Sequence, residues 1–245
     1  MKFRTVSLVS AICLTAALVA QQQKSKPEDT EVWTPVPPVV TPGDGTAAPS
    51  DAVVLLGKDG LGAWINNKGE PSSWDFKDGV VTVRQGAGDL VSKQAFGSCQ
   101  VHLEWRTPAE VKGSGQGRGN SGLFFMGQYE LQILDSYENK TYVNGQAASI
   151  YKQYAPLVNA SRKPGVWQSY DAVFDAPVFE GGKLKKPAYI TVLHNGVLVL
   201  NHVEIKGETV YNGQPAYHPH AAKLPCYLQN HGNPMSFRNM WVREL

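Results

Sequence analysis

The sequence carries little charge of either sign. Of its 245 residues, 23 are Lys or Arg and 21 are Asp or Glu, and charged residues make up 18% of the chain. Lys2 and Arg4 lie in the N-terminal segment 1–20, for which we predict an export signal. Without them the basic and acidic residues are equal in number. Because nucleic-acid binders and polybasic membrane-surface proteins need an excess of basic residues, both classes are disfavoured.

Cysteine is also scarce, with three residues in the whole chain. Cys13 lies in the N-terminal segment, which leaves Cys99 and Cys226 for the folded part. Both follow an apolar strand pattern, so we expect two buried free thiols. A disulfide is the alternative, since export would permit one, but sequence spacing alone cannot establish the required geometry.

The N-terminal apolar run is too short for a comfortable membrane span. Val6 to Ala20 is almost wholly apolar or small, whereas a spanning helix needs roughly 20 residues. Basic residues precede the run and Gln21 ends it, the order typical of a secretory signal. We predict a signal peptide over 1–20 and a secreted or periplasmic protein with no stable membrane insertion after cleavage. An uncleaved anchor is the alternative.

Helical periodicity is lacking as well, whereas turn residues are abundant. Gly (24), Pro (16) and 10% aromatic residues favour a turn-rich β protein. Residues 21–50 are polar and then rich in proline, which predicts a disordered linker. An apolar run from Val53 marks the start of a single domain over 51–245.

Short strand patterns fill that domain. They cover 80–83, 99–105, 123–126, 129–134, 167–174, 189–194, 197–200, 224–229 and 237–242. Asn195-Gly196 between two of them is the preferred type I′ hairpin turn. The pattern predicts an all-β fold, an antiparallel two-sheet jelly-roll sandwich.

Alternation along three of these strands sorts polar side chains away from the core. A β-bulge after Ile133 would return Asp135 to the same polar side. The side chains expected on one surface are His102, Glu104, Glu130, Gln132, Asp135, Gln229 and His231. A solvated sheet face could look similar. However, this set lacks Lys and combines carboxylates and histidines, which transfer protons near neutral pH, with amides that suit sugar hydroxyls.

A glycine-rich loop over 113–122 precedes the strand at 123–126. It lacks the Lys-Ser/Thr ending of a phosphate-binding loop, so nucleotide binding is rejected. The loop is either a flexible tip or a segment that brings Arg118 and Asn120 over the groove. The chain also has no Gly-x-Ser-x-Gly elbow, which argues against an α/β-hydrolase.

Six short motifs occur in an informative order. They are Arg118–Gly122, Tyr129–Ser136, Lys163–Gln168, His194–Gly196, Leu228–Gly232 and Phe237–Trp241. With them, the region from Asp51 to Leu245 resembles the 3-keto-disaccharide hydrolase family. The resemblance implies a concanavalin A-like jelly roll and glycosides already oxidised at C3 of the sugar as substrates. Gln132 stands where the related glucanases carry an acid, which departs from a retaining displacement mechanism.

The resemblance also implies a chemistry for the polar surface. A C3 ketone acidifies the C2 proton, so a base can start an elimination that releases the C1 substituent, and water addition completes the hydrolysis. Under this hypothesis Glu130 or Asp135 is the base and His231 the acid. Arg118, Asn120, Gln132 and Gln229 would bind the substrate, with His102 and Glu104 in support.

Two questions stay open at the level of sequence. A divalent metal held by Glu104, Glu130 or a histidine would also stabilise the enolate, but no ligand spacing is decisive. The same fold could serve as a non-catalytic carbohydrate-binding module. Because a lectin needs no proton donors, Glu130 and Asp135 favour the enzyme.

Overall fold

A computed structural model describes residues 25–245 of the chain, and the predicted signal peptide (1–20) lies outside them. The described residues fall into two units, 25–39 and 40–245. The first contains the short 3₁₀ helix η1 (Pro27–Thr30). The second contains every β-strand of the described part. No helix among the described residues is long and apolar enough to cross a membrane.

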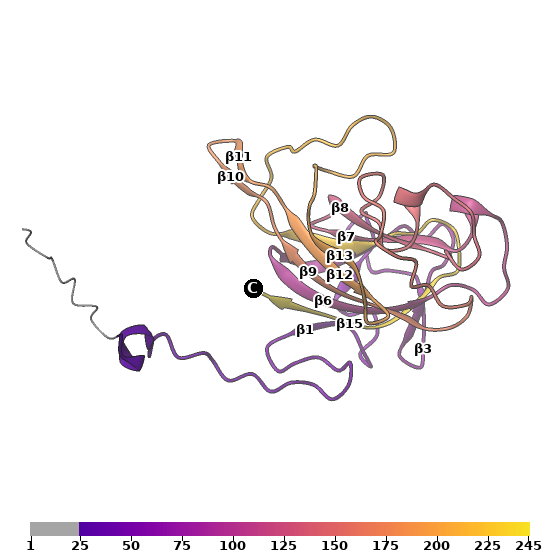
Figure 1. Cartoon of the computed structure of the whole chain (residues 1–245). Helices are drawn as coiled ribbons and strands as arrows, with labels where there is room; N and C mark the ends of the chain where they lie inside the picture. Colours follow the sequence, from indigo (N-terminus) through magenta and orange to yellow (C-terminus); the bar gives the residue numbers. More distant parts are fainter. Residues whose placement is uncertain (1–24) are drawn as a thin grey trace, which may run out of the picture. The chain divides into compact units, whose positions relative to one another are not determined.

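The larger sheet of the second unit has eight antiparallel strands (Figure 1). Seven of them form the order β13-β12-β9-β6-β15-β4-β3, and β1 pairs with β15. Their bounds are β1 (Val53–Leu56), β3 (Asp75–Lys77), β4 (Val80–Thr82), β6 (Cys99–Arg106), β9 (Gln168–Asp175), β12 (Tyr189–His194), β13 (Val197–Glu204) and β15 (Ser236–Glu244). Asn195 and Gly196 connect β12 to β13 with positive φ, as the predicted hairpin turn requires.

The smaller sheet has five antiparallel strands in the order β2-β5-β14-β7-β8. Their bounds are β2 (Trp64–Ile65), β5 (Leu90–Phe96), β7 (Asn120–Phe125), β8 (Tyr129–Leu134) and β14 (Leu224–Leu228). The hairpin β10 (Val178–Glu180) and β11 (Lys183–Lys186) and the 3₁₀ turns η2 (Gly115–Gly117) and η3 (Val143–Gly145) complete the set. The predicted all-β antiparallel sandwich is confirmed.

The core lies between the two sheets and uses one face of each strand. Leu103 and Trp105 of β6 and Leu131 and Ile133 of β8 are fully buried in it. Alternation therefore sends Glu130 and Gln132 of β8 to the opposite face of the smaller sheet. This division places the polar residues of β8 under the loops that cover that face.

Both remaining cysteines belong to this core as free, buried thiols. Burial raises the pKa of the Cys226 thiol to about 11, and it raises that of Cys99 further. The expectation of two buried free thiols is confirmed, and neither is poised as a nucleophile.

The folded unit begins before Asp51, because Thr46 is hydrogen-bonded to the outer face of the larger sheet. Thr46 accepts hydrogen bonds at its carbonyl from Trp241 Nε1 (3.0 Å) and Asn239 Nδ2 (3.0 Å). Its hydroxyl donates to Glu104 (3.0 Å). This part of the predicted linker is therefore held to the sheet, and the contacts explain why Glu104 is only slightly exposed.

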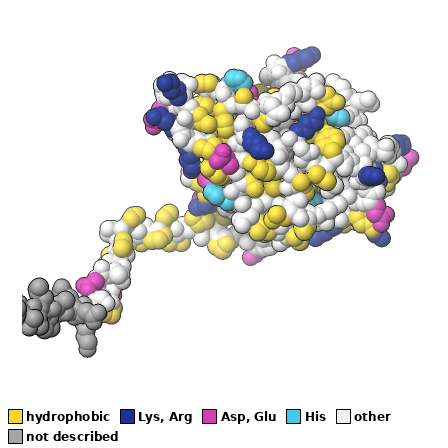
Figure 2. Space-filling view, turned by 45° about the horizontal axis from the view of Figure 1, so that its top comes forward, with side chains coloured by type: hydrophobic (Ala, Val, Ile, Leu, Met, Phe, Trp, Pro, Cys, Tyr) yellow, Lys and Arg dark blue, Asp and Glu magenta, His cyan; other side chains and the backbone are white. Residues whose placement is uncertain are grey.

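The surface of the second unit carries charges of both signs. On the face shown in Figure 2, basic and acidic side chains are dispersed among neutral ones. On this face the described residues form no continuous basic track for phosphates.

Candidate active site

The outer face of the smaller sheet carries a cavity of about 480 Å³. Strands β7 and β8 form its floor, and loops over 142–151 and 209–211 form its walls. It is lined by Gln116, Gly117, Asn120, Phe124, Glu130, Gln132, Tyr142, Tyr151, Thr209, Tyr211, Gln229 and His231. Five of these were predicted to bind or transform the substrate: Asn120, Glu130, Gln132, Gln229 and His231.

Among residues 25–245, Glu130 is the one carboxylate that lines this cavity, and the sequence leaves space for it. The strand pairing sets Gly122 of β7 against Gln132, diagonally across from Glu130. A Cβ at Gly122 would lie 2.6 Å from Glu130 Oε1 and 2.8 Å from a ring carbon of Phe124. Glycine at position 122 therefore leaves the space that the Glu130 carboxyl occupies.

Burial sets the chemistry of Glu130. The residue is 4% exposed, and no ion pair with its carboxylate forms among residues 25–245. Desolvation raises the pKa of Glu130 to about 8, because a charge is costly where water is excluded and no cation compensates it. A carboxyl group with this pKa can exchange a proton near neutral pH and is a strong base once ionised.

An amide network lies beside Glu130. Gln132 Nε2 donates to Gln116 Oε1 (3.3 Å) and Asn120 Oδ1 (3.2 Å). Asn120 Nδ2 in turn donates to the carbonyl of Gln116 (2.7 Å). Gln132 Oε1 is buried and has no hydrogen-bond partner among the described residues. An unpaired acceptor in a polar cavity is suited to a hydroxyl donor on a ligand.

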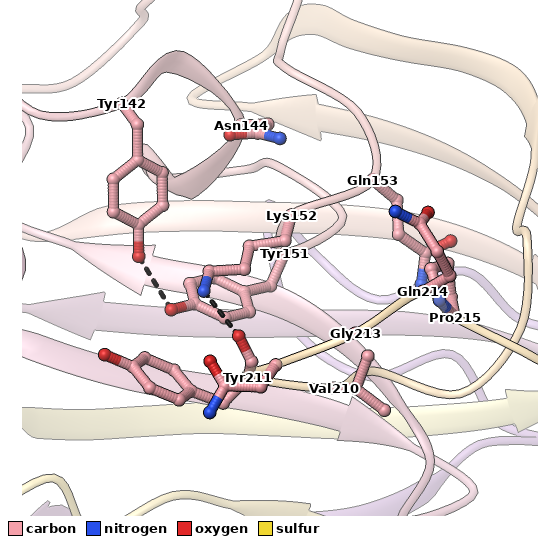
Figure 3. A pocket seen from close by; sticks show the side chains of 11 residues that line it. Tyr142, Asn144, Tyr151, Lys152, Gln153, Val210, Tyr211, Gly213, Gln214 and Pro215 are labelled. Carbon is pink, nitrogen blue, oxygen red and sulfur yellow. Dashed lines mark hydrogen bonds between the residues drawn. The ribbon is translucent and has the colours of Figure 1, made fainter.

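The sequence did not predict the three tyrosines that line the cavity, Tyr142, Tyr151 and Tyr211. The backbone N–H of Tyr151 donates to the carbonyl of Glu130 (3.2 Å), which fixes this tyrosine beside the carboxyl. The hydroxyls of Tyr151 and Tyr142 lie 2.7 Å apart (Figure 3). Tyr211 comes from a third segment. No periodic pattern marks these loop residues, so their convergence could only be seen in the fold.

Gln229 and His231 follow the end of β14 at the opposite side of the cavity. The backbone of Gln229 is fixed to β7, since its N–H donates to Gly122 (2.9 Å) and its carbonyl accepts from Ser121 Oγ (2.7 Å). His231 is exposed at the rim. The two residues bring an amide and an imidazole to the entrance, as the sequence analysis expected.

The structure separates Asp135 and Arg118 from this cavity. Asp135 is 3% exposed and accepts a hydrogen bond from Arg118 Nε (2.7 Å). The remaining nitrogens of Arg118 donate to the carbonyls of Tyr137 (2.9 Å) and Glu138 (3.4 Å). The predicted bulge after Ile133 is absent from the regular β7–β8 register. Asp135 therefore leaves the strand toward a neighbouring 210 Å³ cavity, and Arg118 clamps the following loop.

His102 and Glu104 belong to the other sheet, which corrects the expectation that they support the site. His102 is buried on the outer face of β6, where its ring stacks on Trp241 and its Nδ1 lies 2.6 Å from Asp171. Glu104 binds Arg238 Nε (2.6 Å) and Thr46. Alternation predicts correctly that both point away from the core, but it does not say that two sheets have two outer faces.

The separation of the two sheets also bears on which residues could hold a divalent metal. Glu104 and Glu130 lie on different sheets and could not hold one ion together. Within residues 25–245 there is no group of three or more His, Cys, Asp or Glu side chains that could hold a metal ion.

Comparisons with known proteins agree with this architecture. The chain is similar to a crystal structure of a candidate glycosyl hydrolase from Parabacteroides distasonis ATCC 8503. The two share 48% identity over 90% of this chain and 97% of that one, with a TM-score of 0.86. A second candidate hydrolase from the same organism is 17% identical, over 80% and 94% of the two chains (TM-score 0.59), and shows the common fold alone.

The curated proteins contain no match to this sequence. The family model of the 3-keto-alpha-glucoside-1,2-lyase-like domain matches residues 51–243, which cover all six motifs and the whole cavity. The resemblance based on those motifs is thereby confirmed, and the chain acts on carbohydrates. The protein belongs to the family of 3-keto-alpha-glucoside-1,2-lyase-like domains.

Proposed function

We propose that this protein cleaves the glycosidic bond of glycosides oxidised at C3, by elimination followed by hydration. One observation supports this most: Glu130 is a buried carboxyl, with no ion-pair partner among residues 25–245, on the floor of a cavity lined by amides and tyrosines. Its pKa of about 8 suits proton transfer from carbon next to a ketone. The family name points to the same substrate class.

The reaction needs one base and one acid. Glu130 takes the C2 proton, and the electron pair of the C2–H bond forms an enolate with the C3 carbonyl. The enolate then re-forms the ketone as a C1–C2 double bond appears and the C1–O bond breaks. His231 at the rim gives a proton to the departing oxygen. Addition of one water across the double bond yields the free 3-keto sugar.

The remaining polar groups bind and orient the sugar. Gln229 offers an N–H donor for the enolate oxygen, which stabilises the charge that develops there. Gln132 Oε1 accepts a sugar hydroxyl, and Asn120 fixes the Gln132 amide in place. Tyr151 and Tyr142 present ring faces to the sugar. Asp135 is not the base in this scheme, because its carboxylate is paired with Arg118.

We further propose that the protein works outside the cytoplasm, after removal of residues 1–20. The basic residues and short apolar run at the N-terminus support this assignment. A carbohydrate-binding module without activity is the second candidate. The cavity and its tyrosines would fit it equally well, whereas an isolated buried carboxyl would only weaken the stability of a lectin.

The test follows release of the leaving group. Purified protein is incubated with a 3-keto-glucoside and with its unoxidised parent, each with and without EDTA. We expect release from the 3-keto form alone. Release from the parent at a similar rate would point to an ordinary glycosidase, and release from neither would favour the binding module. Loss of activity in EDTA would show that a divalent metal takes part.

A further inference from the structure

A second cavity of about 420 Å³ lies beside the first. The two cavities share three lining residues, Tyr142, Tyr151 and Tyr211, so they adjoin, and together we call them the groove. We call the cavity with Glu130 the inner pocket and the second one the outer pocket. The outer pocket is closed by residues 210–215 and by Asn144, Lys152 and Gln153 (Figure 3). Each pocket is large enough to hold a sugar ring, since ligand pockets of about 300–1,000 Å³ accommodate whole drug-sized molecules.

The shared tyrosines are placed to contact a ring at the boundary. Tyr211 is 73% exposed, so its ring is available to contact a ligand at this boundary. Tyr142 is 40% exposed and packs edge-on against Tyr151 (centroids 6.2 Å apart). Aromatic rings bury much apolar area at low entropic cost, and the hydrogen bond between the Tyr142 and Tyr151 hydroxyls holds these two rings in place.

Lys152 is held in the outer pocket by backbone and side-chain contacts. Its ammonium donates to the carbonyl of Tyr211 (2.5 Å) and lies 4.1 Å from the centroid of the same ring. Its backbone has φ of +59°, and its N–H donates to the carbonyl of Asn144 (2.7 Å). Left-handed backbone costs energy for a residue with a side chain, and such strain concentrates at functional sites.

The charge of this lysine is not balanced within the groove. Lys152 is the one Lys or Arg, and Glu130 the one Asp or Glu, that the described residues contribute to the walls of the two pockets. No salt bridge of Lys152 forms among residues 25–245. An ammonium has three N–H donors, and Tyr211 uses one. Two donors and a positive charge therefore face the outer pocket.

We propose that the outer pocket binds the second sugar ring of the substrate and that Lys152 selects a ring carrying a carboxylate, as in a uronic acid. The idea rests on the proposed function, because the inner pocket must hold the ring that is cleaved. A carboxylate would accept two charge-assisted hydrogen bonds from Lys152, whereas a neutral ring would offer hydroxyls that gain less. The natural leaving group is then an acidic sugar.

Binding and turnover test the inference separately. Calorimetry compares two unoxidised disaccharides that differ only at C6 of the second ring, a hydroxymethyl group in one and a carboxylate in the other. The full chain should bind the acidic disaccharide about tenfold more tightly at low salt. The preference should shrink as ionic strength rises, since Lys152 is partly exposed. Equal binding, or binding of neither disaccharide, would overturn the inference.

Three variants test whether the preference for the acidic disaccharide comes from Lys152. Lys152→Met keeps the length and backbone demands of the side chain and should bring the preference close to one, whereas Lys152→Arg should keep most of it. Lys93→Met is the matched control, because Lys93 also donates to a backbone carbonyl (Gly62, 2.8 Å) but lies on β5. An unchanged preference in Lys152→Met would refute the role of this lysine.

Turnover then separates the two proposals. The kcat/KM values for the two 3-keto disaccharides should differ in the same direction as their affinities, and Lys152→Met should remove the difference mainly through KM. If the acidic disaccharide binds better but neither 3-keto form is cleaved, the proposed function fails while the binding selectivity stands. If both are cleaved with equal kcat/KM, the selectivity fails and the function stands.

Discussion

Glu130 shows how one residue acquires its chemistry from its neighbours. A glutamate on an exposed strand would ionise near pH 4, but loops 142–151 and 209–211 cover this one. Its backbone N–H is bound by Thr209 Oγ1 (3.0 Å) and its carbonyl by Tyr151, so the loops and the strand are fixed together. The carboxyl is thereby shielded from water, and no cation of residues 25–245 pairs with it.

Replacement of this carboxyl should separate catalysis from binding. Glu130→Gln should lower kcat on a 3-keto-glucoside by about 10²–10⁴-fold, because the amide cannot accept the C2 proton. Affinity for the unoxidised sugar should change little. Glu180→Gln on the exposed β10 is the control. Steady-state kinetics and calorimetry measure both quantities, and unchanged turnover would exclude Glu130 as the base.

The raised pKa of Glu130 also gives a pH dependence with a defined sign. A base must be ionised, so with a leaving group that needs no proton from His231, such as a nitrophenolate, kcat/KM should rise with pH and level off above about 8. Stability should move the opposite way. The folded state keeps the proton up to pH 8 and the unfolded state loses it near 4, so the stability of the wild type relative to Glu130→Gln should fall between these values. A rate that declines through pH 8 would instead make Glu130 an acid.

Gly122 offers a second test of the same geometry. In Gly122→Ala, the new methyl group would meet Glu130 Oε1 and the Phe124 ring, so the carboxyl must move. We expect kcat/KM to fall about tenfold or more, since a misplacement of about 1 Å can cost 10²-fold. Gly62→Ala, whose methyl group would meet its nearest neighbour at 3.9 Å, should retain activity. Full activity in Gly122→Ala would show that the position of the carboxyl is not critical.

At the scale of single elements, strand β8 carries the proposed base Glu130, and the carboxylate that follows its end, Asp135, has a structural role. Asp135 and Arg118 are both nearly buried, and their ion pair joins β8 to the glycine-rich loop. The loop therefore does not present Arg118 to the groove, because the guanidinium is bound to Asp135 and to the carbonyls that follow it. It supplies Gln116 and leads into Asn120, and both residues accept hydrogen bonds from the Gln132 amide.

Breaking this ion pair should affect stability. Asp135→Asn leaves Arg118 buried without its counter-charge, and we expect a loss of about 3 kcal/mol in the free energy of unfolding. Asp51→Asn is the control, since Asp51 pairs with Arg243 Nε at 2.6 Å on the surface and should cost less than about 1 kcal/mol. Denaturant titration measures both. A fully stable but inactive Asp135→Asn would instead favour Asp135 as the base.

The strands show what the sequence could and could not predict. Alternation identified the core faces of β6 and β8 correctly, because the two-residue period of a strand is a local property. It could not assign β6 to one sheet and β8 to the other, because strand order depends on contacts between distant segments. His102 and Glu104 were therefore placed in the site although they lie on the outer face of the larger sheet.

The loop residues of the site could not be predicted from the sequence for a different reason. Tyr142, Tyr151 and Lys152 lie in a segment without regular pattern, and Tyr211 lies some 60 residues later. Their convergence depends on hydrogen bonds such as those of Ala148 and Tyr151 to β8. The one available signal was composition: an aromatic and a basic residue side by side in a loop flanking a strand with a polar face.

For the whole molecule, we expect export from the cytoplasm with removal of the N-terminal signal peptide. We predict that the protein is processed when the full gene is expressed in a Gram-negative host, and that N-terminal sequencing of the periplasmic or secreted form starts after Ala17 or Ala20. Retention of Met1 in a membrane fraction would support the uncleaved anchor.

The fate of the hydrogen at C2 of the sugar shows most directly whether Glu130 abstracts a proton from this carbon. A 3-keto-glucoside carrying deuterium at C2 is incubated with the protein in ordinary water, and the released 3-keto sugar is analysed by mass spectrometry beside the unlabelled substrate. Elimination breaks the C2–H bond, so we predict that the product loses its deuterium and that the labelled substrate reacts more slowly. Release of a 3-keto sugar that keeps its deuterium, at an undiminished rate, would contradict proton abstraction by Glu130 and indicate direct displacement at C1.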